Sequence, residues 1–120
     1  MGAGRPPGSG ADRERESFST YGSRVDLQGS GDSVMTTGYG FFYTDLSDPS
    51  NPDHWYTASF SGTSSASPIV AGAAANLQGI ALAHFGAPLT PFEIRTLLVA
   101  TGSAQLGNAS EHIGPRPDLF

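Results

Sequence analysis

From His54 through Phe92 the chain carries no Asp, Glu, Lys or Arg. This uncharged run includes an alanine-rich apolar segment that reaches to about Phe85 and is long enough for several helical turns. In a helix its apolar residues would lie on most sides, and helices of this kind are covered by other elements in a folded domain. The sequence therefore predicts a buried central helix.

A membrane-spanning helix is the weaker interpretation of the same segment. A bilayer needs a run of roughly 20 apolar residues, and Asn76, Gln78 and several serines interrupt any such run. Two glycines in the helix interior, Gly72 and Gly79, are explained if neighbouring backbone approaches closely there. We therefore expect a core helix and no membrane partner.

The residues that precede this helix have the chemistry of a nucleophile site. A serine hydroxyl attacks a carbonyl only when a base takes its proton and donors stabilise the oxyanion. The first N–H groups of a helix are such donors, because they have no intrahelical acceptor. Ser64 is placed to use them, Gly62 permits a tight turn, and Pro68 is expected in the first turn, where its missing N–H costs little. On its own, a serine at this position is most often a simple helix cap.

The surrounding sequence resembles the subtilisin-like serine peptidases, the subtilase family. Residues 62–68, GTSSASP, match the nucleophile motif G-T-S-x-A-x-P, and the small-residue helix follows at once. Residues 19–26 resemble the family segment S-x-x-G-x-x-V-D, and residues 89–98 resemble its next helix. Residues 1–3 are similar to the end of a V-G-A strand. The resemblance covers nearly the whole chain, but only the C-terminal part of a subtilase domain.

The resemblance implies a fold, an activity and a set of site residues. The implied fold is α/β, a subtilisin-like layered fold with a parallel sheet and a buried central helix, of which this chain is the C-terminal part. The implied activity is that of a serine endopeptidase that hydrolyses peptide bonds through an acyl-enzyme on Ser64. Thr63 would support the oxyanion hole beside Gly62, while Phe60 and Ser61 would lie on the leaving-group side of the scissile bond. Ser65 stands where the family often has methionine.

Two catalytic residues of the family pattern are missing. In subtilases the aspartate, the histidine and the oxyanion asparagine precede the serine, yet residues 1–64 contain neither D-[ST]-G nor H-G-T. His54, His84 and His112 lie outside any such motif. We therefore expect little or no turnover from this chain alone. The expected partners are a polypeptide substrate and the remainder of a peptidase domain that carries the aspartate and the histidine.

Composition excludes several other classes. The net charge of −5 with scattered arginines is unlike a nucleic-acid footprint, and the absence of cysteine removes disulfides, thiolate metal sites and thiol catalysis. No cofactor or metal is assigned to this segment. A calcium site formed by Asp45, Asp48, Asn51 and Asp53 is a weak alternative, because their spacing fits no EF-hand loop, and calcium is left to the complete enzyme. Residues 2–10 contain no apolar signal region, and the complete enzyme is expected to be secreted.

The chain reads as one partial peptidase domain over residues 1–120. We expect a flexible stretch at 1–17, strands and loops at 18–60, the nucleophile motif and central helix at 61–85, and a second helix and C-terminal segment at 86–120. Strands are expected at 24–28 and 33–37, separated by a glycine-rich turn at 29–31. Thr90, Pro91 and Glu93 predict a capped start for the second helix, and Gly102 its end. The aromatic residues at 41–43, 55 and 56 are expected in the core.

Two other functions remain open from the sequence. An α/β-hydrolase would use Ser64, Glu93 and His112 in that order, because residues 62–66 approximate a G-x-S-x-G elbow. Alternatively, the chain is a non-catalytic or decayed fragment that acts as an interaction module. In that case an uncovered central helix would make it associate with itself or with a partner.

Overall fold

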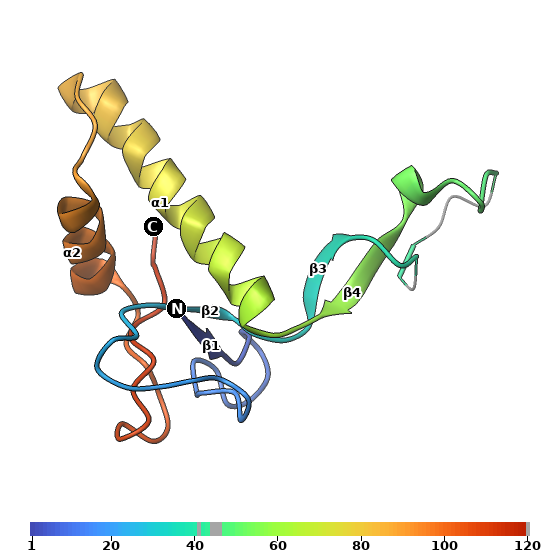
Figure 1. Cartoon of the computed structure of the whole chain (residues 1–120), viewed down its shortest axis with the longest axis horizontal. Helices are drawn as coiled ribbons and strands as arrows, with labels where there is room; N and C mark the ends of the chain where they lie inside the picture. Colours follow the sequence, from blue (N-terminus) through green and yellow to red (C-terminus); the bar gives the residue numbers. More distant parts are fainter. Residues whose placement is uncertain (41, 44–46, 120) are drawn as a thin grey trace.

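Two small sheets and two helices form the structure, a computed structural model that describes residues 1–40, 42–43 and 47–119 (Figure 1). In chain order the elements are β1 (Gly2–Gly4), β2 (Gln28–Ser30), β3 (Val34–Thr37), the 3-10 helix η1 (Pro52–His54), β4 (Tyr56–Phe60), α1 (Thr63–Phe85) and α2 (Pro91–Thr101). The sheets are β1–β2, which is parallel, and β3–β4, which is antiparallel. The expected α/β class is confirmed.

The parallel strands β1 and β2 lie against the start of α1, and their close packing on the helix requires a glycine in β2. Ala3 pairs with Gly29, and a Cβ at Gly29 would lie 2.4 Å from the carbonyl oxygen of Ala66. Only glycine lets the strand and the helix approach this closely. The expected strand at 24–28 and the expected turn at 29–31 are therefore wrong, because Gly29 lies within the strand, which runs from Gln28 to Ser30.

The N-terminal stretch, expected to be flexible over residues 1–17, contains ordered contacts. Residues Gly2–Gly4 form β1 and are buried. Arg15 donates to the Glu111 carboxylate at 2.7 Å and to main-chain oxygens of the segment that follows it. Arg116 donates to both carboxylate oxygens of Asp12, at 2.7 and 3.2 Å. These contacts join the N-terminal segment to residues near the C-terminus. They lie in the stretch that was expected to be flexible.

Helix α1 is covered on one side only. Its buried side chains are few, and they face β1, β2 and α2: Ser65, Ala66, Val70, Ala73 and Ala81. The core is formed by Leu27, Val70, Ala73 and Leu98. The opposite side is open, with Ile80 52% and Phe85 78% exposed. The expectation of a buried helix is therefore only half met, because the described elements are too few to surround it.

Length and composition alone would allow α1 to cross a membrane. Its mean hydropathy is 1.3 over the most apolar stretch, of which 22% is buried within the fold. Core helices of folded domains pass the same test, and the buried side of α1 packs against a sheet and a second helix. The packing agrees with a core helix that lacks part of its cover.

Helix α2 starts as the sequence predicts. The Thr90 hydroxyl accepts from the Glu93 N–H at 3.3 Å, and the Glu93 carboxylate accepts from the Thr90 N–H at 2.7 Å. These reciprocal bonds form a capping box. The hydrogen bonds that the Glu93 carboxylate accepts from the Thr90 N–H and from the Thr90 hydroxyl hold the pKa of Glu93 below its ordinary value. Gln78 of α1 bonds both the N–H and the carbonyl of Leu89, each at 2.8 Å. This pair of bonds fixes α2 beside the second half of α1.

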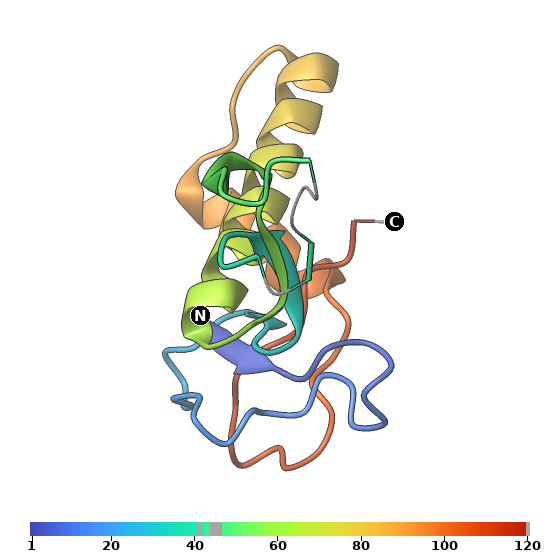
Figure 2. The same cartoon turned by 90° about the vertical axis from the view of Figure 1, so that its right-hand side faces the viewer.

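The second sheet projects away from the rest of the molecule. We call β3, β4 and the described residues between them the arm (34–40, 42–43 and 47–60). Figure 1 shows it extending from the start of α1, and in Figure 2 it points toward the viewer. The radius of gyration, 16.4 Å, exceeds the roughly 14 Å of a compact domain of this length. The aromatic residues expected in the core are instead on the surface here, with Phe42 59% and Tyr43 52% exposed. Phe41 lies outside the described residues.

Candidate functional site

The proposed nucleophile lies in the first turn of α1. Ser64 is the second residue of the helix and is exposed. The turn into the helix is made by Gly62, whose φ of 101° is in a region that favours glycine. The Gly62 N–H donates to the Gly31 carbonyl at 2.7 Å, which ties this turn to the residue after β2. The sequence motif is therefore displayed at a helix N-terminus, as predicted.

Unpaired hydrogen-bond donors surround Ser64 at the start of α1. In the described part of the chain, the N–H groups of Thr63 and Ser64 have no acceptor, and neither side-chain hydroxyl has a hydrogen-bond partner. The first turn of α1 contains no acidic residue. Unpaired N–H donors and the positive end of the helix dipole favour a negative oxygen at such a position.

Ser65 does not face the same space as Ser64. Its side chain is 1% exposed, and its hydroxyl lies 2.9 Å from the Ser30 carbonyl oxygen and 2.8 Å from that of Gly62. The hydroxyl therefore anchors the start of α1 to the end of β2. The sequence did not reveal the part played by Ser30 and Gly31, whose main-chain oxygens hold the site in place, because a main-chain contact leaves no signal in residue type.

Two neighbouring expectations differ in detail. Pro68 lies inside the helix and not in its first turn, because α1 begins earlier, at Thr63. Since proline has no N–H, the helical bond to the Ser64 carbonyl cannot form. On the other side of the turn, Phe60 ends β4 and is half-buried, while Ser61 is exposed. Both lie directly beside the turn that carries Ser64.

No histidine is hydrogen-bonded to Ser64 among the residues that the structure describes. His84 is twenty residues further along α1, which corresponds to about 30 Å at the rise of an α-helix. His54 lies in η1 on the arm. The main-chain oxygen of His112 accepts from the N–H of Gly22, in the base of the molecule. The proposed nucleophile therefore has no histidine bonded to it among the described residues.

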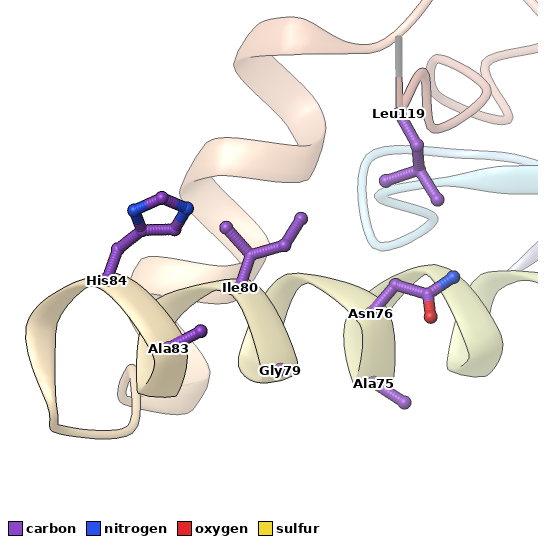
Figure 3. Close-up of a pocket in the computed structure, with 7 residues that line it drawn as sticks. All are labelled: Ala75, Asn76, Gly79, Ile80, Ala83, His84 and Leu119. Carbon is purple, nitrogen blue, oxygen red and sulfur yellow. The ribbon is translucent and has the colours of Figure 1, made fainter.

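A surface hollow on α1 lies away from this site. It is lined by residues of α1 from Ala75 to His84 and by Leu119 near the C-terminus (Figure 3). Ala75 is eleven residues from Ser64, or about 16 Å along the helix. Figure 3 shows Asn76, Ile80 and His84 on the side of the helix that faces Leu119. The hollow is a feature of the uncovered face of α1 and contains no nucleophile.

The described residues do not form a metal site. No group of three or more His, Asp or Glu side chains comes together within ranges 1–40, 42–43 and 47–119. In the weak calcium alternative, Asn51 accepts from the Asp53 N–H at 3.1 Å and Asp48 from the Ser50 hydroxyl at 3.0 Å. Asp45 lies outside the described residues.

The α/β-hydrolase triad is not assembled. Glu93 is engaged in its capping box beside Leu89, which is bonded to Gln78. Gln78 is fourteen residues from Ser64 along α1, or about 21 Å. The strand before the serine, β4, also belongs to an antiparallel pair and not to the parallel sheet. The esterase alternative is therefore wrong on geometry.

Comparison with known proteins agrees with the sequence motif. The model of the subtilase family (peptidase S8) matches residues 9–114. An extracellular protease from Xanthomonas campestris pv. campestris is 33% identical over 100 residues, which is 83% of this chain. The chain spans 15% of the length of that relative. Because the family match extends from the N-terminal segment past α2 and includes the serine motif, this chain belongs to the subtilase family.

Proposed function

We propose that the chain is the nucleophile-bearing part of a subtilisin-like serine endopeptidase. The observation that carries this proposal is the exposed Ser64 in the first turn of α1, inside the segment that the family model matches. In the proposed reaction, Ser64 Oγ loses its proton to a base and attacks the carbonyl carbon of a peptide bond. The C–N bond then breaks, the amine leaves with a proton from that base, and water hydrolyses the acyl-enzyme.

The first turn of α1 would stabilise the oxyanion of this reaction. The Ser64 N–H is the proposed main-chain donor, and the Thr63 hydroxyl is proposed to support it. Gly62 leaves room for the substrate backbone, and Phe60 and Ser61 are proposed to lie on the leaving-group side. Ser65 is proposed to hold the first turn of α1 in place without facing the substrate, because its hydroxyl is turned toward Ser30.

The base is proposed to come from a polypeptide segment outside residues 1–120 that carries the catalytic histidine and aspartate. The open side of α1 supports this proposal, because it is apolar, uncharged and uncovered in the described structure. A Cβ at Gly72 or Gly79 would meet no atom within 4 Å among the described residues. The expected close approach to these two glycines is thus not made within the chain, and a further segment is proposed to make it. Alone, the chain is proposed to have little or no turnover.

The name of the Xanthomonas relative supports a proposed location outside the cell for the complete enzyme. The proposed substrate is a polypeptide, and no cofactor is proposed for the reaction on Ser64. Any calcium in the complete enzyme is proposed to bind outside the residues described here.

The test is covalent labelling of Ser64 by a fluorophosphonate probe. The full product of the gene, and this chain mixed with the missing domain segment, are treated with the probe and assayed on casein. We expect labelling and hydrolysis in both, and their loss in Ser64→Ala. Ser67→Ala is the matched control, because its hydroxyl bonds only the Thr63 carbonyl of its own helix, at 2.9 Å. Undiminished labelling of Ser64→Ala, or none in the full product, would overturn the proposal and favour a non-catalytic fragment.

A further inference from the structure

The arm exposes a set of large apolar side chains that no described element covers. Met35 is 60% exposed, Phe42 59%, Tyr43 52% and Tyr56 39%. The strands of the arm pair with each other, and β3–β4 is a two-stranded sheet. Exposed aromatic residues that gather on one projecting element are typical of an interaction surface.

Two of these rings are held in a fixed arrangement. Tyr43 and Tyr56 form an antiparallel bridge, with N–H to oxygen distances of 3.4 and 3.0 Å. Their ring centroids are 5.9 Å apart and the planes are inclined by 60°. Because the main chain fixes both residues, their exposed ring faces are available to a partner without further ordering of the backbone.

The arm that carries these rings also carries negative charge. Asp48 and Asp53 are exposed, and neither carboxylate is paired with an arginine among the described residues. The loop that carries them is folded onto Trp55, whose indole N–H donates to the Pro49 carbonyl at 3.1 Å. Between residues 25 and 94 the chain has no Lys or Arg at all. The surface is therefore aromatic and acidic, and it carries no lysine or arginine, His54 being its one basic side chain.

We propose that the arm is a docking surface for a basic polypeptide segment. An arginine or lysine of the partner would lie over the faces of Tyr43 and Tyr56, where the ring quadrupole attracts a cation. A second basic side chain would pair with Asp48 or Asp53. The chain already contains one such contact, with the Arg15 guanidinium 4.9 Å from the Tyr21 ring centroid.

The negative charge of the arm favours a basic polypeptide over nucleic acids and anionic lipid surfaces as the partner. Nucleic acids and anionic lipid surfaces require basic groups on the protein, and carboxylates would repel both. The docking step does not need Ser64 to react, so it goes beyond the proposed catalytic function. Only Ser61 and Gly62 lie between β4 and α1, so the arm is joined directly to the helix that carries Ser64.

Trp55 provides the measurement, because it is the only tryptophan in the chain and lies within the arm. The protein is titrated with a short peptide of alternating Arg and Ser, and with the same peptide containing Glu in place of Arg, while Trp55 fluorescence is followed. We expect saturable binding of the Arg peptide alone, weakened by about 0.5 M NaCl because salt screens exposed charges.

Two variants test the two parts of the surface. Asp48→Asn with Asp53→Asn should weaken binding of the Arg peptide about fivefold or more. Tyr43→Leu, which keeps an apolar side chain without a ring, should weaken it about two- to fivefold. Glu14→Gln with Glu16→Gln is the matched control, since it removes the same charge from a segment outside the arm and should leave binding unchanged.

The proposal is overturned if the Glu peptide binds as tightly as the Arg peptide, or if the control pair weakens binding as much as the Asp48 and Asp53 pair. A Trp55 signal that changes with protein concentration alone would also overturn it, because a second copy would then occupy the arm. None of these results depends on hydrolysis, so they leave the proposed role of Ser64 to its own test.

Discussion

The hydroxyl of Ser65 lies 2.9 Å from the main-chain oxygen of Ser30 and so joins the start of α1 to the end of β2. The side chain is 1% exposed, and the same hydroxyl is within bonding distance of the Gly62 carbonyl. One buried group thus connects the parallel sheet, the turn at Gly62 and the helix that carries Ser64.

Ser65→Ala should lower the free energy of unfolding by about 1 kcal/mol, because it removes the buried hydroxyl that bonds the Ser30 carbonyl. Urea denaturation followed by circular dichroism measures this change. Ser67→Ala is the control, since it removes a bond within the helix and should change stability by no more than about 0.5 kcal/mol. Equal effects of the two substitutions would show that the bond to Ser30 does not stabilise the fold.

Two glycine substitutions should have opposite effects. Gly29→Ala places a Cβ 2.4 Å from the Ala66 carbonyl oxygen, so the strand and helix must separate, at a cost of about 1–3 kcal/mol. Gly72→Ala meets no described atom and should stabilise this chain by about 0.5–1 kcal/mol. Thermal unfolding of both variants measures the difference.

The same Gly72→Ala variant also tests the proposed cover of α1. If a further domain segment packs closely at Gly72, the substitution should weaken association with that segment while it stabilises the chain alone. Unchanged association in a pull-down with the purified segment would contradict a close approach at this position.

Acid should destabilise the protein below about pH 4. Hydrogen bonds from Arg116 hold the pKa of Asp12 below its ordinary value, and a hydrogen bond from Arg15 does the same for the pKa of Glu111. Because the unfolded carboxyls titrate near about 4, the unfolded state binds more protons in acid. The stabilisation is therefore complete above that pH and is lost as the pH falls through the lower pKa values of the folded state.

Urea midpoints between neutral pH and about pH 3 measure this dependence. Asp12→Asn should be less stable than the wild type at neutral pH and should lose less stability in acid. Parallel pH curves for the two proteins would rule out a contribution from the pair of Asp12 and Arg116.

The open side of α1 should cause self-association at high protein concentration. Ile80→Gln combined with Phe85→Gln should reduce it, because these exposed side chains lie on the uncovered helix, whereas Met35→Gln on the arm should have little effect. Sedimentation velocity over a concentration series measures the association. A wild-type chain that remains monomeric throughout would contradict the prediction.

The sequence predicted correctly those features that depend only on neighbouring residues in the chain. The capping box at Thr90 and Glu93 and the display of Ser64 at a helix start both follow from residue types at fixed spacing. The strand at Gln28–Ser30 was missed, because glycine favours turns locally and only the approach of Ala66 makes it the required strand residue.

The exposure of the arm was also beyond sequence reasoning, and an uncovered α1 was expected only for the alternative of a non-catalytic fragment. An apolar pattern states which side chains favour burial, but not whether other elements are present to bury them. The same limit applies to Tyr43 and Tyr56, which were expected in the core and lie on the surface. The anchoring oxygens of Ser30 and Gly31 could not be found either, since every residue has a carbonyl group.

The contacts between the two ends of the chain determine when the protein can fold. The Gln28 side chain donates to the Gly114 carbonyl at 2.7 Å, the Gln28 N–H donates to the Pro115 carbonyl at 3.0 Å, and Ile113 is fully buried. During synthesis, β1 and β2 leave the ribosome long before these residues exist, so the parallel sheet must wait for the last part of the chain. Until then the glycine-rich strands and the apolar α1 are exposed together, which makes the nascent chain a natural client for chaperones.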